Sequence, residues 1–163
     1  MSERAAKVSL LPVTDADFDR LAGMRITAMR ESLERVGRFN PERARERLRS
    51  TFSPEHTRVI AFEEVPVGFY AARPSAEGLR LDHLYVLPDF QSRGIGGEVL
   101  RKIFEEADKD AAPILVGALK ESASNRFYQR HGFVKTSESE WDIYYVRPPS
   151  KKEANQPPEP SRL

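Results

Sequence analysis

The chain of 163 residues contains no cysteine, which excludes a disulfide framework, a thiolate metal site and a cysteine nucleophile. It also lacks an apolar run long enough to cross a membrane, and its N-terminal residues lack the apolar core of a signal peptide. The net charge is small as well, because 26 lysines and arginines are balanced by 25 aspartates and glutamates. No global field therefore draws the molecule toward nucleic acid or a membrane. We expect a cytoplasmic protein with neither of these partners, and we assign no metal ligands.

The composition is that of an ordinary globular domain, with 39% hydrophobic and 31% charged residues. A chain of this length can bury a substantial core, so we expect one domain over residues 1–147. Residues 148–163 differ, because five of these sixteen residues are proline and none is aromatic. Such a segment cannot bury enough apolar surface to order itself, and we predict a flexible C-terminal tail there.

Apolar spacing and helix-end signals predict the element order β, α, α, β, β, β, α, β, α, β, β. Thr14 and Asp17 have the spacing of a capping box, and Asn40 before Pro41 marks the start of a second helix. Gly132 is expected to close a short helix near the C-terminus. Helices interspersed with strands favour an α/β domain with a mixed sheet. The expected strands lie at 7–13, 57–74 (two strands), 79–88, 113–119 and 134–148 (one or two strands), and the last two helices at about 94–107 and 124–132.

Residues 87–97, LPDFQSRGIGG, place glycines at 94, 96 and 97 between an expected strand and an expected helix. The first amides of a helix form an anion site together with its dipole, and glycines let a phosphate approach the backbone. A dinucleotide fingerprint needs G-x-G-x-x-G and a Walker loop needs G-x-x-x-x-G-K-S/T, and neither pattern is present. The pattern Q/R-x-x-G-x-G/A, typical of a loop that binds the pyrophosphate of coenzyme A, is filled by Gln91 to Gly96. A structural turn that binds nothing is the remaining interpretation.

A second motif follows at residues 125–133, NRFYQRHGF, which is similar to a signature in which a short helix carries F-Y-x-x-x-G-F. With both motifs, the chain resembles the GCN5-related N-acetyltransferase (GNAT) superfamily over roughly residues 79–136. The resemblance implies the GNAT fold, an α/β architecture in which a mixed, mostly antiparallel central sheet of six to seven strands is flanked by about four helices. It also implies acetyl-CoA (coenzyme A as the carrier) as the cosubstrate.

The resemblance further implies which backbone segments hold acetyl-CoA. Peptide groups near the end of the strand before the loop would bond the pantetheine and polarise the thioester carbonyl, and the helix start would hold the pyrophosphate. Many relatives carry an asparagine seven residues before the motif tyrosine, and here that position is Glu121. Either Glu121 turns toward the substrate, as a further candidate base, or Ser122 or Asn125 takes the place of the asparagine as donor. The implied cofactor-binding residues are Leu84, Tyr85, Val86, Gln91, Ser92, Arg93, Gly94, Ile95, Gly96, Gly97, Glu121 and Asn125.

For catalysis, the resemblance points to Tyr128 as the general acid that protonates the leaving thiolate; the alternative is a packed aromatic residue whose hydroxyl only bonds the sulfur. A thiol has a pKa of about 8.5 and a tyrosine of about 10, so this proton transfer is reasonable once the thiolate forms. An amine like that of lysine, with a pKa of about 10.4, must lose a proton before it attacks. Asp82 and His83 are candidate bases on opposite faces of one strand, with Asp82 favoured and a water chain as the third option.

The implied function is an N-acetyltransferase that transfers an acetyl group to the amine of a small molecule. Without cysteine no acetyl-cysteine intermediate can form, so we expect direct attack in a ternary complex. The alternatives are an enzyme that acetylates a protein α-amine or lysine, and a non-catalytic acyl-CoA-binding module. A homodimer is a further expectation from the resemblance.

Residues 20–49 hold nine arginines against four glutamates. One interpretation is a solvated face with i,i+4 ion pairs such as Glu31–Arg35. The other is that one or two arginines steer an acidic acceptor toward the site. Interleaved glutamates and the small net charge argue against a nucleic-acid surface.

Overall fold

The computed structural model describes residues 7–150, which form two compact units. The first unit contains residues 7–73 and 81–99, and the second contains residues 74–80 and 100–150. The strands are β1 (Val8–Pro12), β2 (Thr57–Phe62), β3 (Val65–Ser75), β4 (Gly78–Val86), β5 (Ile114–Leu119), β6 (Val134–Glu138) and β7 (Asp142–Arg147). The helices are α2 (Phe18–Arg35), α3 (Pro41–Thr51), α4 (Ile95–Lys109) and α5 (Ser124–Arg130), with 3-10 turns η1 (Asp15–Asp17), η2 (Pro54–His56) and η3 (Pro88–Phe90).

The order of these elements along the chain confirms the predicted one. Within the described residues, seven strands follow the order β1-β2-β3-β4-β5-β7-β6, accompanied by four α-helices. The β1–β2, β2–β3, β5–β7 and β6–β7 pairs are antiparallel, as expected for a mostly antiparallel sheet. Most of the predicted tail, residues 151–163, lies outside the described residues.

The helix-start signals of the sequence are also confirmed. Thr14 Oγ1 accepts a hydrogen bond from the Ala16 amide at 3.2 Å, and the Thr14 amide donates to Asp17 at 2.9 Å, which completes the capping box. At the start of α3, the Asn40 side chain accepts from the Arg43 amide at 3.1 Å. These bonds satisfy amides that the first turn of a helix leaves without a partner.

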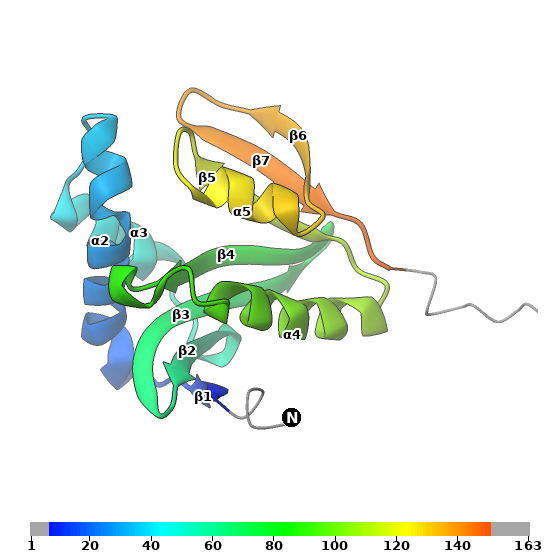
Figure 1. Cartoon of the computed structure of the whole chain (residues 1–163), viewed down its shortest axis with the longest axis horizontal. Helices are drawn as coiled ribbons and strands as arrows, with labels where there is room; N and C mark the ends of the chain where they lie inside the picture. The colour runs from blue at the N-terminus through cyan, green and yellow to red at the C-terminus, as the bar shows by residue number, and fades with distance from the viewer. Residues whose placement is uncertain (1–6, 151–163) are drawn as a thin grey trace, which may run out of the picture. The chain divides into compact units, whose positions relative to one another are not determined.

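In the first unit, β1, β2 and β3 lie side by side (Figure 1), with Val59 of β2 opposite Phe69 of β3. α2 turns Phe18 and Leu21 into a core that also contains Val59, Phe69 and, from α3, Leu48. Burial of these side chains gives the hydrophobic free energy that holds the two helices on the sheet.

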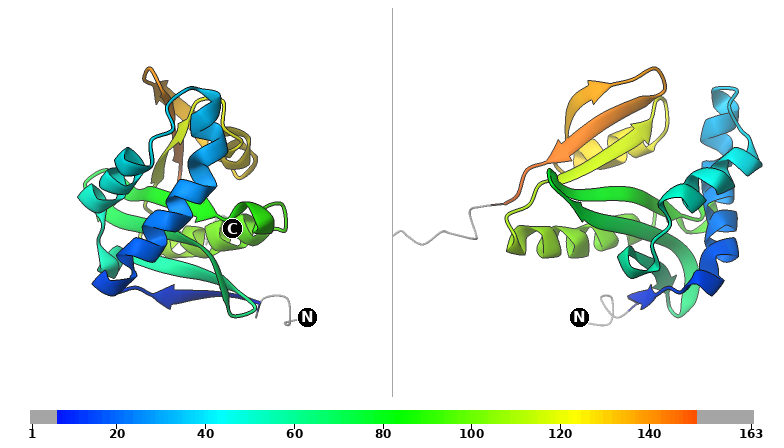
Figure 2. Two further views of the ribbon diagram at one scale, coloured as in Figure 1. Left: turned by 90° about the vertical axis from the view of Figure 1, so that its left-hand side faces the viewer. Right: turned by 180° about the vertical axis from the view of Figure 1, so that it is seen from behind.

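The second unit is built on β5, β7 and β6, with α5 lying across one face of this small sheet (Figure 2). Alternation along β7 buries Tyr145 and exposes Tyr144. Arg147 of β7 forms a bidentate ion pair with Asp108 of α4, at 2.8 and 3.2 Å, and its guanidinium lies 3.9 Å from the ring centre of Phe104. This pair ties the last strand to α4.

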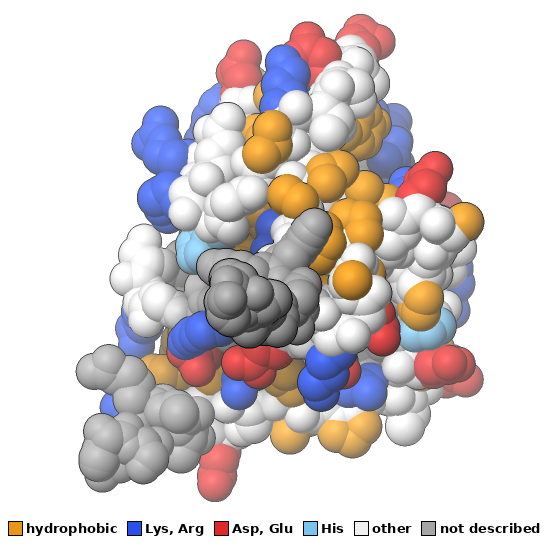
Figure 3. Space-filling model, turned by 90° about the vertical axis from the view of Figure 1, so that its right-hand side faces the viewer, with side chains coloured by type: hydrophobic (Ala, Val, Ile, Leu, Met, Phe, Trp, Pro, Cys, Tyr) orange, Lys and Arg blue, Asp and Glu red, His pale blue; other side chains and the backbone are white. Residues whose placement is uncertain are grey.

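Charges of both signs are interspersed on one face of the protein. The face drawn in Figure 3 carries basic and acidic side chains interspersed with hydrophobic ones, which agrees with a formal net charge of +1. Between residues 7 and 150, no helix combines the length and apolarity that crossing a bilayer requires.

Candidate active site

The end of β4 lies so close to β3 that only glycine fits at position 68. A Cβ built on Gly68 would lie 2.0 Å from the carbonyl oxygen of Tyr85. Tyr85 therefore turns its carbonyl toward β3, and the Leu87 amide likewise donates to a β3 carbonyl at 2.8 Å. Because the peptide groups of successive strand residues point to opposite edges, those of Leu84 and Val86 face the edge of β4 away from β3.

The loop after β4 turns through left-handed backbone, with φ of 64° at Ser92 and 85° at Gly94. The side chain of Gln91 closes the loop onto the strand, because its Nε2 donates to the Val86 carbonyl at 2.7 Å. Ser92, Arg93 and Gly94 are exposed. Arg93 stands over the ring of Phe90, 5.1 Å from its centre, so a positive charge lies beside the loop.

The first turn of α4 offers backbone donors to an anion. The Glu98 amide donates to the Gly94 carbonyl at 3.0 Å, so the helical hydrogen bonds begin there. The amides of Ile95, Gly96 and Gly97 precede this bond and have no helical acceptor. Together with the positive end of the helix dipole, these amides fit a diphosphate.

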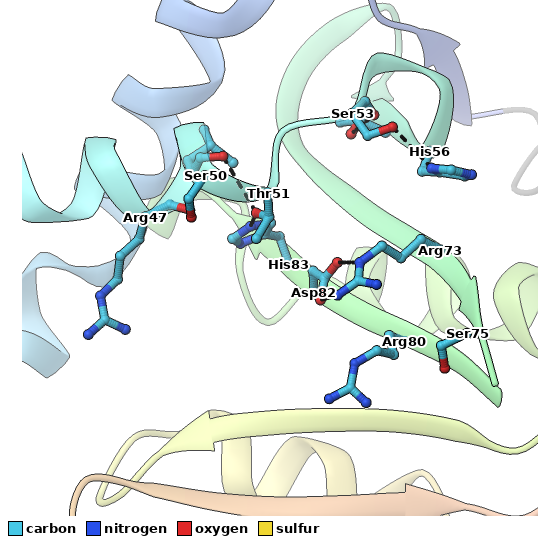
Figure 4. A network of polar contacts seen from close by, with 12 residues as sticks. Arg47, Ser50, Thr51, Ser53, His56, Arg73, Ser75, Arg80, Asp82 and His83 are labelled. Atoms are coloured by element: carbon cyan, nitrogen blue, oxygen red, sulfur yellow. Dashed lines mark hydrogen bonds and ion pairs between the residues drawn. The ribbon is translucent and has the colours of Figure 1, made fainter. Parts of the chain in front are cut away.

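Asp82 and Arg73 form an ion pair between β4 and β3 (Figure 4). Arg73 Nε donates to Asp82 Oδ2 at 2.6 Å, and a second nitrogen lies 3.5 Å from Oδ1. The Asp82 side chain is 19% exposed and that of Arg73 is 40% exposed. The guanidinium thus fixes the orientation of a carboxylate that water can still reach.

His83, the other candidate base, lies on the opposite face of β4 and is buried. Its Nε2 is 3.1 Å from Thr51 Oγ1 (Figure 4), and its Nδ1 is 3.3 Å from the Tyr85 hydroxyl. Burial, and next the charge of Arg25, lowers the pKa of His83 to about 3. An imidazole in this state is a poor proton acceptor near neutral pH, which argues against His83 as the base.

The buried guanidinium of Arg25 is a feature that the sequence analysis missed. It donates to the Tyr85 hydroxyl at 3.1 Å and to the Ala44 carbonyl at 2.8 Å, and the residue is 8% exposed. Position 25 follows Leu21 by one helical turn and so falls on the apolar face of α2. That spacing is the signal that separates it from the exposed arginines of the same helix.

Most other arginines of α2 and α3 have nearby acids or rings, which supports the interpretation of a solvated face. The predicted Glu31–Arg35 pair forms at 3.3 Å. The further partners are Asp17 for Arg20 (3.1 Å), Glu34 for Arg30 (3.2 Å), Asp19 for Arg45 (2.7 Å) and the ring of Phe18 for Arg49 (3.9 Å).

Tyr128 lies on α5 in the second unit and is 5% exposed. Its ring packs against those of Phe127, Phe133 and Tyr145, with centroid distances of 5.4, 5.1 and 6.3 Å. α5 ends at Arg130, and Gly132 just beyond it has a φ of 93°, which favours glycine. The aromatic contacts hold the ring in one orientation, which a proton donor requires.

Asn125 is engaged within the second unit. Its Nδ2 donates to the carbonyls of Leu119 and Ser122, each at 3.0 Å, and its Oδ1 accepts from the Tyr145 hydroxyl at 2.8 Å. These bonds fix α5 to β5 and β7, so the amide is committed to the fold. Glu121 is exposed in the turn after β5, with a φ of 67°.

The structure divides the predicted site residues between the two units. The first unit contains Asp82, His83, the β4 edge and the loop into α4, whereas Glu121, Asn125 and Tyr128 belong to the second.

Comparison with known families identifies the class of protein. Residues 53–135, just over half of the chain, match the sequence model of the acetyltransferase (GNAT) domain. The chain therefore belongs to the GNAT acetyltransferase family, as its two motifs indicated. As in this family generally, acetyl-CoA is the cosubstrate.

Solved structures share the fold at low sequence identity. An acetyltransferase from Thermus thermophilus is 22% identical with a TM-score of 0.69, covering 87% of this chain and 97% of that one. The PaiA N-acetyltransferase from Thermoplasma acidophilum, solved in complex with coenzyme A, is 14% identical with a TM-score of 0.71 (86% and 98% covered). An N-acetyltransferase of a ribosomal-protein alanine from Escherichia coli is 15% identical with a TM-score of 0.66 (88% and 94% covered). A search of curated proteins by sequence found no match.

Proposed function

We propose that the protein is an N-acetyltransferase that transfers the acetyl group of acetyl-CoA to the amine of a small molecule, by direct attack in a ternary complex. The observation that carries the proposal is the arrangement of three parts of the first unit: the edge of β4 away from β3, the loop, and the first turn of α4. Membership of the GNAT family supports this assignment of the donors.

Acetyl-CoA supplies the acetyl group as a thioester, which an uncharged amine can attack. The peptide groups of Leu84 and Val86 are assigned to the pantetheine and the thioester carbonyl, because both face the same edge of β4. A preorganised donor of this kind is worth about 3 kcal/mol in catalysis. The amides between Ser92 and Gly97 are assigned to the pyrophosphate, and Gln91 braces the loop that presents them.

Two side chains are assigned to proton transfer. Asp82 accepts the proton that the amine must lose, directly or through a water chain, while Arg73 keeps its carboxylate in place. Tyr128 donates a proton to the sulfur of the leaving thiolate. Its ring is kept in place by packing against neighbouring aromatic rings such as that of Phe133. Because the chain has no cysteine, the amine attacks the thioester itself and no acetyl-cysteine forms.

The assignment of Asp82 is tested by Asp82→Asn, which keeps the shape of the side chain and removes the base. We expect kcat to fall roughly hundredfold near neutral pH. The loss should shrink as pH rises, because the amine then sheds its own proton. The matched control is Asp19→Asn, a surface aspartate on α2 whose side chain is 82% exposed. A pH–rate profile that Asp82→Asn leaves unchanged would remove Asp82 as the base.

The choice of a small amine over an acidic peptide as the acceptor rests on the charge that α2 and α3 present. The arginines of α2 and α3 are mostly engaged by neighbouring acids and rings, so these helices do not present a continuous cationic track for an acidic peptide. A protein α-amine is the second candidate, because a neighbour with the same fold is an N-acetyltransferase of a ribosomal-protein alanine.

A panel of acceptors distinguishes the two candidates: alkyl diamines and amino acids against peptides with free N-termini or lysines. Product mass spectrometry and coenzyme A release would be measured with each. We expect the highest kcat/KM with a small amine. Transfer to peptides alone would contradict the proposed acceptor while upholding acetyl transfer.

A further inference from the structure

A partly buried chain of hydrogen bonds runs from α2 through β4 to α3 in the first unit, with Arg25 and His83 as its buried members. Arg25 Nε lies 3.1 Å from the Tyr85 hydroxyl, which lies 3.3 Å from His83 Nδ1. His83 Nε2 then lies 3.1 Å from Thr51 Oγ1, which donates to the Leu48 carbonyl at 3.5 Å. Every polar atom of His83 and of the Tyr85 side chain is used within this chain.

Donors and acceptors follow one consistent direction along this hydrogen-bond chain. A guanidinium has donors only, so the Tyr85 oxygen accepts from Arg25 and its proton is left for His83 Nδ1. That nitrogen is then an acceptor, and the proton of the neutral imidazole sits on Nε2. Nε2–H donates to Thr51, whose own proton goes to the backbone of α3. The hydrogen bonds thus assign one tautomer to His83.

We propose that this hydrogen-bond chain positions β4 for acetyl transfer: it fixes the Tyr85 side chain of β4 against Arg25 of α2 and so sets the flanking peptide groups of Leu84 and Val86. This inference rests on the proposed function. It makes His83 and Arg25 positioning residues, which act through Tyr85 and exchange no proton with the substrate.

Three independent contacts converge on Tyr85. Its hydroxyl is held between Arg25 and His83, its ring lies 5.4 Å from that of Phe69, and its carbonyl occupies the space that a side chain at Gly68 would need. A strand residue held at hydroxyl, ring and carbonyl transmits its position to the peptide groups on either side.

Interrupting this hydrogen-bond chain also carries a cost in free energy. In residues 7–150 no carboxylate pairs with Arg25, whose buried charge is met by the Ala44 carbonyl and by the hydroxyl and ring of Tyr85, 5.7 Å from the guanidinium carbon. Removing one member leaves a buried donor or acceptor without a partner, which destabilises the local arrangement.

The first test is the tautomer of His83, read from long-range proton–nitrogen NMR spectra of the labelled full-length protein. We expect the Nε2–H tautomer, unchanged between about pH 6 and about pH 8, where a solvated histidine would titrate. An Nδ1–H tautomer, or a titration of His83 in that range, would overturn the inference.

The second test removes single hydroxyl groups. Thr51→Val and Tyr85→Phe each break the chain, and each should lower kcat roughly ten- to hundredfold through misplacement of the reacting groups. Thr51→Ser keeps the hydroxyl and should restore kcat. The control is Thr57→Val, at a more buried position than Thr51, which deletes a hydroxyl that donates to the Ser53 carbonyl at 2.7 Å outside the chain. Equal effects of Thr51→Val and Thr57→Val on kcat would overturn the inference.

Calorimetric titration with acetyl-CoA separates failure of this inference from failure of the proposed function. If the wild type acetylates no amine, the proposed function fails, and binding still tests the positioning. Tyr85→Phe should then weaken acetyl-CoA binding roughly tenfold, by about 1.4 kcal/mol. Unchanged affinity together with an unchanged His83 tautomer would contradict the positioning role.

Discussion

At the scale of single residues, Asp82 and His83 show how neighbours on one strand acquire different chemistry. Alternation sends their side chains to opposite faces of β4. Asp82 meets a guanidinium at a position that water reaches, whereas His83 is enclosed between hydroxyl groups and loses its basicity through burial. In our proposal, Asp82 is the base and His83 is a positioning residue.

Gly68 gives a prediction about the end of β4. Gly68→Ala places a Cβ against the Tyr85 carbonyl, so β4 must shift away from β3. We expect a loss of roughly 1–3 kcal/mol in the free energy of unfolding and weaker binding of acetyl-CoA. The control is Gly23→Ala on α2, where a Cβ meets nothing within 4 Å. This control should gain up to about 1 kcal/mol from helix propensity. Denaturant titration of both variants measures the contrast, and equal stabilities would contradict the close approach.

Tyr128 gives a prediction about proton donation. Tyr128→Phe keeps the packed ring and removes the hydroxyl, so kcat should fall roughly hundredfold while affinity for acetyl-CoA stays near that of the wild type. Tyr144→Phe, at an exposed position of β7, is the control and should leave both quantities unchanged. Steady-state kinetics and calorimetry check the split. Lost affinity with unchanged kcat would make the hydroxyl a binding group instead of an acid.

At the scale of elements, local signals sufficed for helices and strands. The capping box at Thr14, the Asn40 cap and the close of α5 at Gly132 all follow from residue types at fixed spacing. The direction of the peptide groups on β4 could not be predicted, because it depends on pairing with β3. The commitment of Asn125 to Leu119 and Tyr145 was equally hidden, since it depends on contacts distant in sequence.

The turn between β2 and β3 carries avoidable strain. Glu63 and Glu64 both adopt positive φ, 52° and 72°, a conformation that Asn-Gly adopts more readily in a hairpin. Replacing the pair by Asn-Gly should raise the free energy of unfolding by about 1 kcal/mol, net of the exposed Lys7–Glu63 ion pair. Thermal and urea unfolding measure the change. No gain in stability would contradict the left-handed turn.

The ion pair between α4 and β7 predicts a pH dependence of stability. The hydrogen-bonding guanidinium of Arg147 holds the pKa of Asp108 below its usual value. The pair therefore stabilises the fold above the unfolded-state pKa of about 3.9, and this contribution is lost as pH falls through the folded-state value. Asp108→Asn should cost about 1 kcal/mol at neutral pH and nearly nothing in strong acid.

Denaturant unfolding of wild type and Asp108→Asn at a series of pH values checks this. Glu105→Gln, on the same helix, controls for loss of one negative charge. A difference between wild type and Asp108→Asn that persists unchanged into strong acid would contradict the role of the ion pair.

At the scale of the whole molecule, the sequence lacks both cysteine and a large net charge, and both absences are consistent with the family to which the chain belongs. Balanced charge and the lack of cysteine leave a direct acyl transfer by positioned groups as the chemistry to test. The loop from Gln91 to Gly97 and the motif around Tyr128 identified the family from sequence alone, because both depend on short local patterns. The acceptor could not be identified in this way, since its recognition depends on side chains brought together from separate elements.

The central claim is tested most directly by thiol release from acetyl-CoA in the presence of amines, with mass analysis of the product. Because the chain has no cysteine, every thiol that appears belongs to coenzyme A. We predict release that requires both protein and amine, with one acetyl group added to the amine. Binding of acetyl-CoA without release, for every amine tested, would contradict catalysis and indicate a module that binds acyl-CoA and transfers nothing.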